Sequence, residues 1–336
     1  MNNKNILMDV SWSNMGGIGR FTDEVSKLLT GISRSILYKN CASPLAPLGL
    51  AKSIYQQKNA DLIFLPGYIP PLFCSKKFIL TIHDLNHLDL SDNSSFLKRS
   101  FYNFIIKRGC HQAYKIFTVS NFSKERIAKW SGVDPDKIVT VYNGVSEEFN
   151  INVIPMNLGY KYLLCVGNRK THKNEKRVIS AFAKADIDDS IKLVFSGNPS
   201  SELEKIIKQY GISERVTFLG FVSEEDLPSL YKGSLGLVFP SLYEGFGLPV
   251  VEAMACGIPV LTSVTSSLPE VAGNAAILVD PEVVEDITEG ITKLVNDTVL
   301  RERLIHNGIV RAKKFSWQSV VNEIEMVLAE ACNGIK

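Results

Sequence analysis

The feature that most constrains the fold of this chain is a regular alternation of short apolar runs with stretches of helical spacing. Short apolar runs bounded by turns are typical of buried strands. Strands that alternate with helices form parallel sheets covered by helices on both faces. The expected strands are Ile6–Val10, Asp61–Leu65, Phe78–Ile82, Ile116–Val119 and Ile138–Tyr142, then Tyr162–Val166, Lys192–Phe195, Val216–Leu219, Leu235–Phe239, Pro259–Leu261 and Ala276–Val279.

The length of the chain predicts two domains. At 336 residues the chain is longer than a single hydrophobic core usually serves. The apolar pattern lapses around Pro155, so we expect an N-terminal domain over 1–153 and a C-terminal domain over 154–315. Only helical segments follow Pro281. The last of them, 316–333, has no strand left to pair with, so we expect it to pack on existing surface, with the first domain as the candidate.

The composition is that of an ordinary globular protein, with 45% apolar and 21% charged residues. No run approaches the roughly 18 apolar residues of a membrane span, and the N-terminus enters a strand without the pattern of a secretory signal. The six cysteines show no zinc-knuckle or redox spacing. We therefore expect a cytoplasmic protein.

The net charge of +2 is unevenly distributed. Residues 1–153 hold 18 Lys and Arg against 12 Asp and Glu, a net +6, and the remainder holds 19 against 23, a net −4. A basic half can face phosphates, nucleic acid or anionic lipid. Uneven surface charge without a partner explains the same numbers, and both interpretations stay open.

The strongest chemical signal is a glycine-rich turn between a buried strand and a helix. Gly245 and Gly247 remove side chains, so backbone N–H groups there can approach a ligand at the positive end of the helix that starts near Pro249. Glu244 precedes the turn and Glu252 lies one helical turn inside, so both carboxylates can point into one cleft. Ligands of open α/β sheets bind at the carboxyl ends of strands, where this turn lies.

The run EGFGLPVVEAMACGIPV, residues 244–260, resembles the signature of retaining glycosyltransferases of the GT-B fold, family 4. The resemblance implies two facing Rossmann-like domains with parallel sheets and the donor in a cleft between them. It also implies that Glu252 holds the nucleotide ribose and that Glu244 contacts hydroxyls of the donor sugar. The backbone amides of Phe246, Gly247 and Leu248 would assist.

A basic loop, 165–174, follows the first strand of the second half. Its Arg169 and Lys173 lie beyond a strand end, and a diphosphate leaving group needs fixed positive charge. A solvated basic loop is the alternative. The resemblance favours donor phosphates, because the family places an arginine and a lysine in this loop. Val222, in the segment 221–223, is our candidate near the nucleotide base.

Two further matches lie in the first half. Gly17 and Gly19 belong to a glycine loop after the first strand that lacks the dinucleotide-binding spacing. The resemblance implies that this loop closes over the donor. His83 and Asp84 end an apolar strand, where a histidine is usually structural, but the family places a histidine beside the donor sugar and we give Asp84 an orienting role.

Three other residues of the first half are candidates for contacts with the acceptor or the cleft. A helix N-cap and an Asn-Gly turn explain the same residues adequately. These candidates are Ser120, Asn121 and Asn143.

We expect neither a metal nor any other cofactor. The only aspartate cluster, Asp186–Asp189, precedes a strand and so lies at the wrong end of it for the cleft. No residue is an obvious nucleophile, and the resemblance implies front-face attack in which the departing diphosphate oxygen helps to deprotonate the acceptor. Arg169, Lys173, Glu244 and His83 would then act by charge and positioning.

The expected reaction is transfer of a hexose to a glycan or lipid-linked glycan in surface polysaccharide biosynthesis. We expect the hexose to be mannose and the donor to be GDP-mannose. A UDP-sugar donor and a non-catalytic nucleotide-sugar-binding subunit are the alternatives. A Rossmann oxidoreductase is disfavoured by the missing fingerprint, and we expect no nucleic-acid partner. The segment 95–108 places two basic pairs among aromatics, which suits peripheral contact with an anionic membrane. A helix packed into the first domain explains it equally well.

Overall fold

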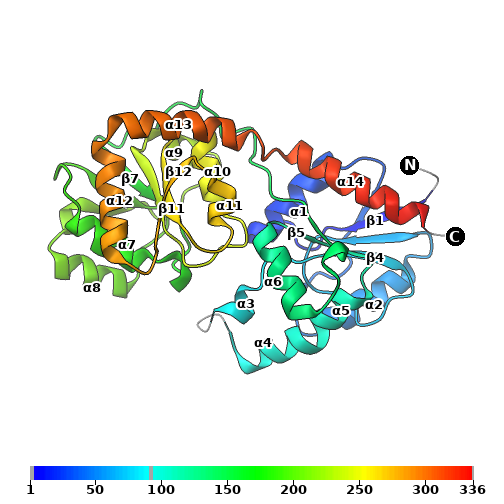
Figure 1. The fold of residues 1–336 in the computed structure, drawn as a ribbon. Helices are drawn as coiled ribbons and strands as arrows, with labels where there is room; N and C mark the ends of the chain where they lie inside the picture. The colour runs from blue at the N-terminus through cyan, green and yellow to red at the C-terminus, as the bar shows by residue number, and fades with distance from the viewer. Residues whose placement is uncertain (1–3, 91–93, 335–336) are drawn as a thin grey trace. The chain divides into compact units, whose positions relative to one another are not determined.

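The computed structural model describes residues 4–90 and 94–334, which form two compact units. Unit 1 comprises Met1–Gly144 and Trp317–Lys336, and unit 2 comprises Val145–Ser316. The change of unit falls after Gly144 rather than after residue 153. Each unit is built on one six-stranded sheet (Figure 1).

The sheet of unit 1 has the strand order β2-β1-β3-β4-β5-β6, and all its pairings are parallel. Order reverses between β1 and β3, which lie side by side although β2 intervenes in the chain. The strands are β1 (Ile6–Asp9), β2 (Ser33–Ser35), β3 (Leu62–Leu65), β4 (Lys77–Thr81), β5 (Lys115–Thr118) and β6 (Ile138–Thr140).

Side chains of this sheet alternate between two apolar cores. Ile79 and Phe117 pack against α1 and α14 on one face, whereas Leu80 and Ile116 pack against α2, α5 and α6 on the other. This alternation explains why the strands are continuously apolar, since both faces are covered. The helices are α1 (Gly16–Leu28), α2 (Ala46–Gln56), α3 (Asn86–Asp89), α4 (Phe96–Phe101), α5 (Lys107–Gln112), α6 (Asn121–Ser131) and α14 (Trp317–Asn333).

Helix α14 belongs to unit 1 although it ends the chain. Val320, Ile324 and Leu328 are buried in the same core as Phe21 and Val25 of α1. Figure 1 shows α14 lying along α1. The C-terminal segment therefore completes one face of the first sheet.

The sheet of unit 2 has the order β12-β11-β10-β7-β8-β9 and is also parallel. Helices α7, α8 and α12 contribute to the core on one face. The strands are β7 (Tyr162–Cys165), β8 (Lys192–Phe195), β9 (Val216–Phe218), β10 (Gly236–Phe239), β11 (Val260–Ser263) and β12 (Ala276–Val279). The helices are α7 (Glu175–Lys184), α8 (Ser201–Tyr210), α9 (Leu227–Gly233), α10 (Leu248–Ala255), α11 (Leu268–Ala272), α12 (Val284–Asn296) and α13 (Thr298–Ala312).

The region 30–60 holds two elements that apolar spacing does not predict, namely β2 and α2. Strand β2 is three residues long and polar, with two of its residues exposed, so it carries no apolar signal. In the described part of the chain, 4–90 and 94–334, no helix has the length and apolar character that crossing a membrane requires.

Candidate functional site

Loops with candidate residues leave both sheets where strand order reverses. In unit 2 the strands follow the dinucleotide-fold order 3-2-1-4-5-6, in which β7 and β10 are the central pair. The crevice beyond the carboxyl ends of that pair is where such sheets bind ligands. The basic loop follows β7 and the glycine-rich turn follows β10, so the topology brings the two strongest sequence signals to one place.

Arg169 lies in the basic loop, but protein groups surround its guanidinium. Its backbone is left-handed, with φ of 61°. Nη1 donates to Oε1 of Glu175 at 2.5 Å, Nε donates to the Asn198 carbonyl at 2.9 Å, and Nη2 donates to the Ser196 carbonyl. The charge also lies over the Phe195 ring, 5.3 Å from the centroid. Each guanidinium nitrogen already has a partner, so Arg169 joins the ends of β7 and β8.

Glu175, the first residue of α7, is the counter-charge of this arginine. Its side chain lies directly beneath Gly167, where a Cβ would meet Oε1 at 2.6 Å. Burial raises the pKa of Glu175, and the charge of Arg169 opposes that rise. Glu175 is not among the residues predicted from the sequence. A glutamate in the first turn of a helix reads as a dipole charge, and only the fold shows that it pairs with Arg169.

Lys173 and Glu244 come from the two different loops and contact each other. Lys173 Nζ donates to Glu244 Oε1 at 2.7 Å, and their side chains are 14% and 13% exposed. The ammonium also lies 4.9 Å from the Phe239 ring centroid, at the end of β10. Lys173 is the cation expected at the donor phosphates, and Glu244 is the carboxylate expected at the donor sugar. The two side chains therefore lie together at the crevice of unit 2.

The glycine-rich turn is fixed by hydroxyl groups from the loop after β11. The Glu244 amide donates to Ser266 Oγ at 3.0 Å, and Ser267 Oγ donates to the carbonyls of Glu244 and Phe246. Gly247 has φ of 103°, which only glycine adopts readily, and a Cβ there would meet Leu268 at 2.6 Å. Helix α10 begins at Leu248 immediately after it. Pro249 has no N–H and the Val250 N–H donates to the Gly247 carbonyl at 3.0 Å, so the Leu248 N–H is the one at the start of this helix that can face a ligand.

Glu252 is buried on α10, with an exposed fraction of 3%. Its Oε2 accepts a hydrogen bond from the Tyr231 hydroxyl at 2.9 Å. The Tyr231 ring, on α9, stacks edge-on against Phe149. Tyr231 was not found from the sequence, because an apolar helix face explains a tyrosine there without any partner. The hydrogen bond fixes the position of one carboxylate oxygen.

Val222 is partly exposed in the loop after β9, and its neighbour Phe221 is 91% exposed. Ser223 is fixed by a hydrogen bond to Asp226 at 2.7 Å. Large apolar side chains are exposed at many other places in the described chain, so the exposure of Phe221 does not by itself identify a ligand site. Its ring belongs to the candidate base-binding segment 221–223.

In unit 1, His83 follows β4 and packs edge-on against Phe21 of α1. Its Nε2 lies 2.9 Å from the Pro66 carbonyl. Since a carbonyl only accepts, Nε2 carries the proton and Nδ1 is left as an acceptor. Burial lowers the pKa of His83 to about 4, so the ring is neutral at neutral pH.

The glycine loop after β1 lies at the point where strand order reverses in unit 1. A Cβ on Gly19 would meet the Trp12 carbonyl at 2.8 Å, so glycine is required there for packing. A Cβ on Gly17 would meet nothing within 4 Å. Packing therefore explains Gly19, while the open space at Gly17 leaves room for a ligand.

The remaining candidates of unit 1 differ in their surroundings. Asp84 Oδ1 accepts from the Asn86 amide at 3.0 Å. Ser120 is the N-cap of α6 and accepts from the Ser123 amide, and Asn121 bonds Tyr142 and Thr140. Asn143 is 6% exposed, and its Oδ1 has no hydrogen-bond partner.

Among the described residues no group of three or more His, Cys, Asp or Glu is placed to hold a metal ion. The aspartate cluster before β8 is a turn. Asp189 forms a surface ion pair with Arg215 at 2.8 Å, and its own side chain is 93% exposed.

Two family matches span most of the chain. Residues 146–311 match the family of glycosyl transferases group 1, and residues 16–149 match glycosyltransferase family 4. The chain is 30% identical over 267 residues to O-antigen chain mannosyltransferase B of Escherichia coli, covering 74% of this chain and 69% of that protein.

Solved structures share the fold over nearly the full length. Sucrose-phosphate synthase from Thermosynechococcus elongatus has a TM-score of 0.78 at 18% identity, covering 97% of this chain and 98% of that one. HepE of Anabaena in complex with UDP and glucose has a TM-score of 0.75 at 19% identity, covering 97% and 99%. The two parallel α/β units thus have the GT-B fold.

Proposed function

This chain belongs to the glycosyltransferases of group 1 and family 4, and we propose that it transfers mannose from GDP-mannose, with retention, to a hydroxyl of a glycan or lipid-linked glycan. The observation that carries the proposal is the contact between Lys173 and Glu244 at the crevice of unit 2. It supplies a cation for a diphosphate and a carboxylate for sugar hydroxyls at one point. Glu252, one helical turn further, is suited to the ribose.

The chemistry that we propose is front-face transfer. The bond between the sugar's anomeric carbon and the diphosphate oxygen breaks, and the acceptor oxygen bonds to the same face of that carbon. The acceptor proton passes to the departing diphosphate oxygen. Charge develops on the diphosphate, so a fixed cation lowers the barrier.

Lys173 is the residue that we assign to this charge. Its ammonium keeps two further N–H groups beyond the one given to Glu244. Arg169 gives three of its five N–H groups to Glu175 and to the carbonyls of Ser196 and Asn198, which fixes the guanidinium at the ends of β7 and β8. Because of this fixation we give Arg169 a positioning role, in which it holds the loop that presents Lys173.

The donor is proposed on the similarity to the O-antigen mannosyltransferase. The structural likeness to HepE with UDP and glucose makes a UDP-sugar the alternative. Thermal unfolding with GDP, UDP and ADP decides between them, because a nucleotide at a hundred times its Kd stabilises by about 2.7 kcal/mol. Stabilisation by UDP and none by GDP would refute the GDP-mannose assignment.

Catalysis is tested with Glu244→Ala and Glu252→Ala. Both variants should fold, and each should lose about a hundredfold or more in transfer rate from labelled GDP-mannose to a lipid-linked acceptor. Glu270→Ala, at a glutamate on α11, serves as the control. Transfer by either site variant at the parent rate removes the site assignment. Nucleotide binding without transfer or donor hydrolysis by the parent would favour a non-catalytic subunit.

The acceptor side of the proposal includes contact with an anionic membrane. Phe96, Leu97 and Phe104 are 83%, 79% and 74% exposed on the helical segment of α4, a π-helical turn (Tyr102–Ile106) and α5. Lys98 and Arg99 are exposed beside them. Exposed aromatic and basic side chains on one helix suit the interface of anionic lipid. Such contact would place the protein on the cytoplasmic face of a membrane.

A further inference from the structure

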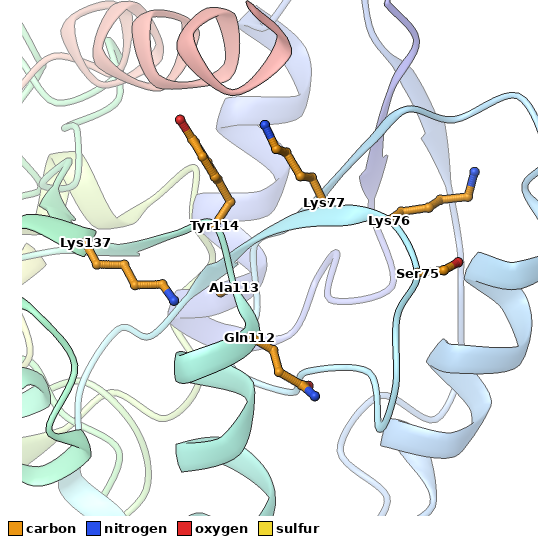
Figure 2. A pocket seen from close by; sticks show the side chains of 7 residues that line it. All are labelled: Ser75, Lys76, Lys77, Gln112, Ala113, Tyr114 and Lys137. Atoms are coloured by element: carbon orange, nitrogen blue, oxygen red, sulfur yellow. The ribbon is translucent and has the colours of Figure 1, made fainter. Parts of the chain in front are cut away.

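A hollow of about 600 Å³ lies at the amino-terminal edge of the unit 1 sheet, where β4, β5 and β6 begin. Figure 2 shows Lys137 and Gln112 on one side of it and Lys76 and Ser75 on the other, with Lys77 and Tyr114 extending towards α14. The candidate residues of unit 1 lie at the opposite edge. A strand of five residues is about 16 Å long, so one small ligand cannot reach both edges.

Three ammonium groups line this hollow without a counter-ion. Lys76 Nζ donates to the Ala60 carbonyl at 2.5 Å, Lys77 Nζ to the Ala331 carbonyl at 3.1 Å, and Lys137 Nζ to the His111 carbonyl at 2.6 Å. Within 4–90 and 94–334 none of these three lysines forms an ion pair. Carbonyl oxygens hold the ammonium groups in place but carry no net charge, so three positive charges stay uncompensated.

The other lining groups are suited to an oxyanion. Ser75 offers a hydroxyl and Gln112 an amide, both of which donate hydrogen bonds. Lys115, just outside the hollow, donates to the Asp136 carbonyl at 3.1 Å and adds a fourth positive charge nearby. Among the described residues, one carboxylate forms a hydrogen bond with a lining side chain. It is Glu330, which accepts from the Tyr114 hydroxyl at 3.0 Å.

We propose that this hollow binds a small, multiply charged phosphate-containing anion, of the size and charge of a diphosphate. The volume falls in the range of small-molecule sites, roughly 300–1,000 Å³. The lining holds no large exposed apolar side chain that would enter a bilayer, and the hollow is open to solvent, so a soluble anion can reach it. The site accounts for part of the positive charge of the N-terminal half.

The hollow has two further properties. Burial lowers the pKa of Lys137, which disfavours its ammonium form, and a bound anion would offset this effect. Lys77 and Tyr114 also connect the hollow to the last turn of α14, through Ala331 and Glu330. An anion held by Lys77 would therefore stabilise unit 1 against unfolding, independently of the donor site.

The test is calorimetric titration of the full chain with inorganic pyrophosphate, after the donor site has been saturated with GDP. The parent should bind pyrophosphate with a stoichiometry of one, and Lys76→Gln/Lys77→Gln/Lys137→Gln should weaken this binding at least tenfold. The control Lys39→Gln/Lys52→Gln/Lys129→Gln removes the same charge from exposed lysines of unit 1 and should bind as the parent does. Equal binding by both triple variants, or none by the parent, overturns the proposal.

Two additional arms keep the result interpretable. If the triple variant fails to fold, Lys137→Gln alone should still weaken pyrophosphate binding several-fold, and an unchanged affinity counts against the site. Sedimentation with phosphatidylglycerol vesicles separates a soluble anion from a lipid headgroup. Vesicle binding lost in the triple variant, without pyrophosphate binding by the parent, would assign the hollow to lipid and overturn the proposal.

Discussion

At the scale of single residues, His83 shows how packing decides protonation. Its Nε2–H is donated to the Pro66 carbonyl, and burial lowers its pKa from 6.5 to about 4. The ring can accept a hydrogen bond from a sugar hydroxyl through Nδ1, but it carries no charge at the pH of a cell. We therefore expect His83 to act by orientation, and the activity should show no titration near pH 6.5 from this residue.

A pH dependence of stability follows from His83. Between pH 6.5 and about 4 the unfolded chain binds a proton at this residue that the folded chain does not. The free energy of unfolding should therefore fall as pH decreases through this window, by at most about 1.4 kcal/mol per pH unit. Urea unfolding across pH 4–6.5 should show a shallower dependence in His83→Gln than in the parent. The same slope in both would contradict the assignment, and His306→Gln, at an exposed histidine, controls for loss of a histidine.

The ion pair between Arg169 and Glu175 should matter more to stability than any surface pair. The two side chains are 18% and 9% exposed, and removal of Glu175 leaves the arginine charge buried. Glu175→Ala should lower the free energy of unfolding by about 3 kcal/mol, measured by urea denaturation. Glu202→Ala breaks the exposed pair with Lys176 and should change it by less than about 1 kcal/mol. Similar losses in both variants would show that Arg169 finds other compensation.

At the scale of elements, the segment from α4 through α5 has two possible roles according to its sequence, namely contact with an anionic membrane and packing into the first domain. Tyr102 and Ile106 are buried in unit 1, as packing of the helix requires, yet Phe96, Leu97 and Phe104 stay exposed. The helix is capped by Ser95, which accepts from the Lys98 amide, and it is tied to α6 by the bond from Trp130 to Asn103. Packing thus accounts for one face of the segment and leaves the other without a role.

We predict that this exposed face mediates vesicle binding. Lys98→Glu/Arg99→Glu/Lys107→Glu/Arg108→Glu should abolish co-sedimentation with anionic vesicles, because each basic residue near such a surface contributes about 1 kcal/mol. Lys107 donates to the Trp130 carbonyl, so the charge-reversal variant also breaks a hydrogen bond within unit 1. A second variant, Phe96→Ser/Leu97→Ser/Phe104→Ser, keeps that bond and should also lose vesicle binding. Leu48→Ser, at an exposed apolar residue of α2, is the control. Absence of vesicle binding by the parent would refute the prediction.

At the scale of the whole molecule, we predict transfer without a divalent metal. Lys173 and the positive end of the α10 dipole supply positive charge at the crevice of unit 2. Turnover in excess EDTA should match turnover without it, and Lys173→Ala should lose about a hundredfold in rate in both conditions. Abolition by EDTA with rescue by magnesium or manganese would show that a metal carries this charge.

The sequence by itself determined the α/β class, eleven of the strands in outline and the family, because buried parallel strands are continuously apolar and the run 244–260 is distinctive. It also placed Glu244 and Lys173 beyond strand ends. Short polar β2 and the position of Gly144 as the end of a unit were not predictable, since neither carries an apolar signal. Periodicity is a local property, and it reports which residues are buried but not which residues become neighbours.

Only the tertiary structure decided the partners. Strand order brought the loops after β7 and β10 together, so that Lys173 meets Glu244, and it enclosed Arg169 between Glu175 and the carbonyls of Ser196 and Asn198. Lys173 and Glu244 are far apart in the chain. Glu175 is close to Arg169 in the chain, but its position in the first turn of α7 does not by itself indicate a partner. The physical reason is that the charge available to a ligand depends on the neighbours a side chain acquires on folding, and sheet topology sets those neighbours.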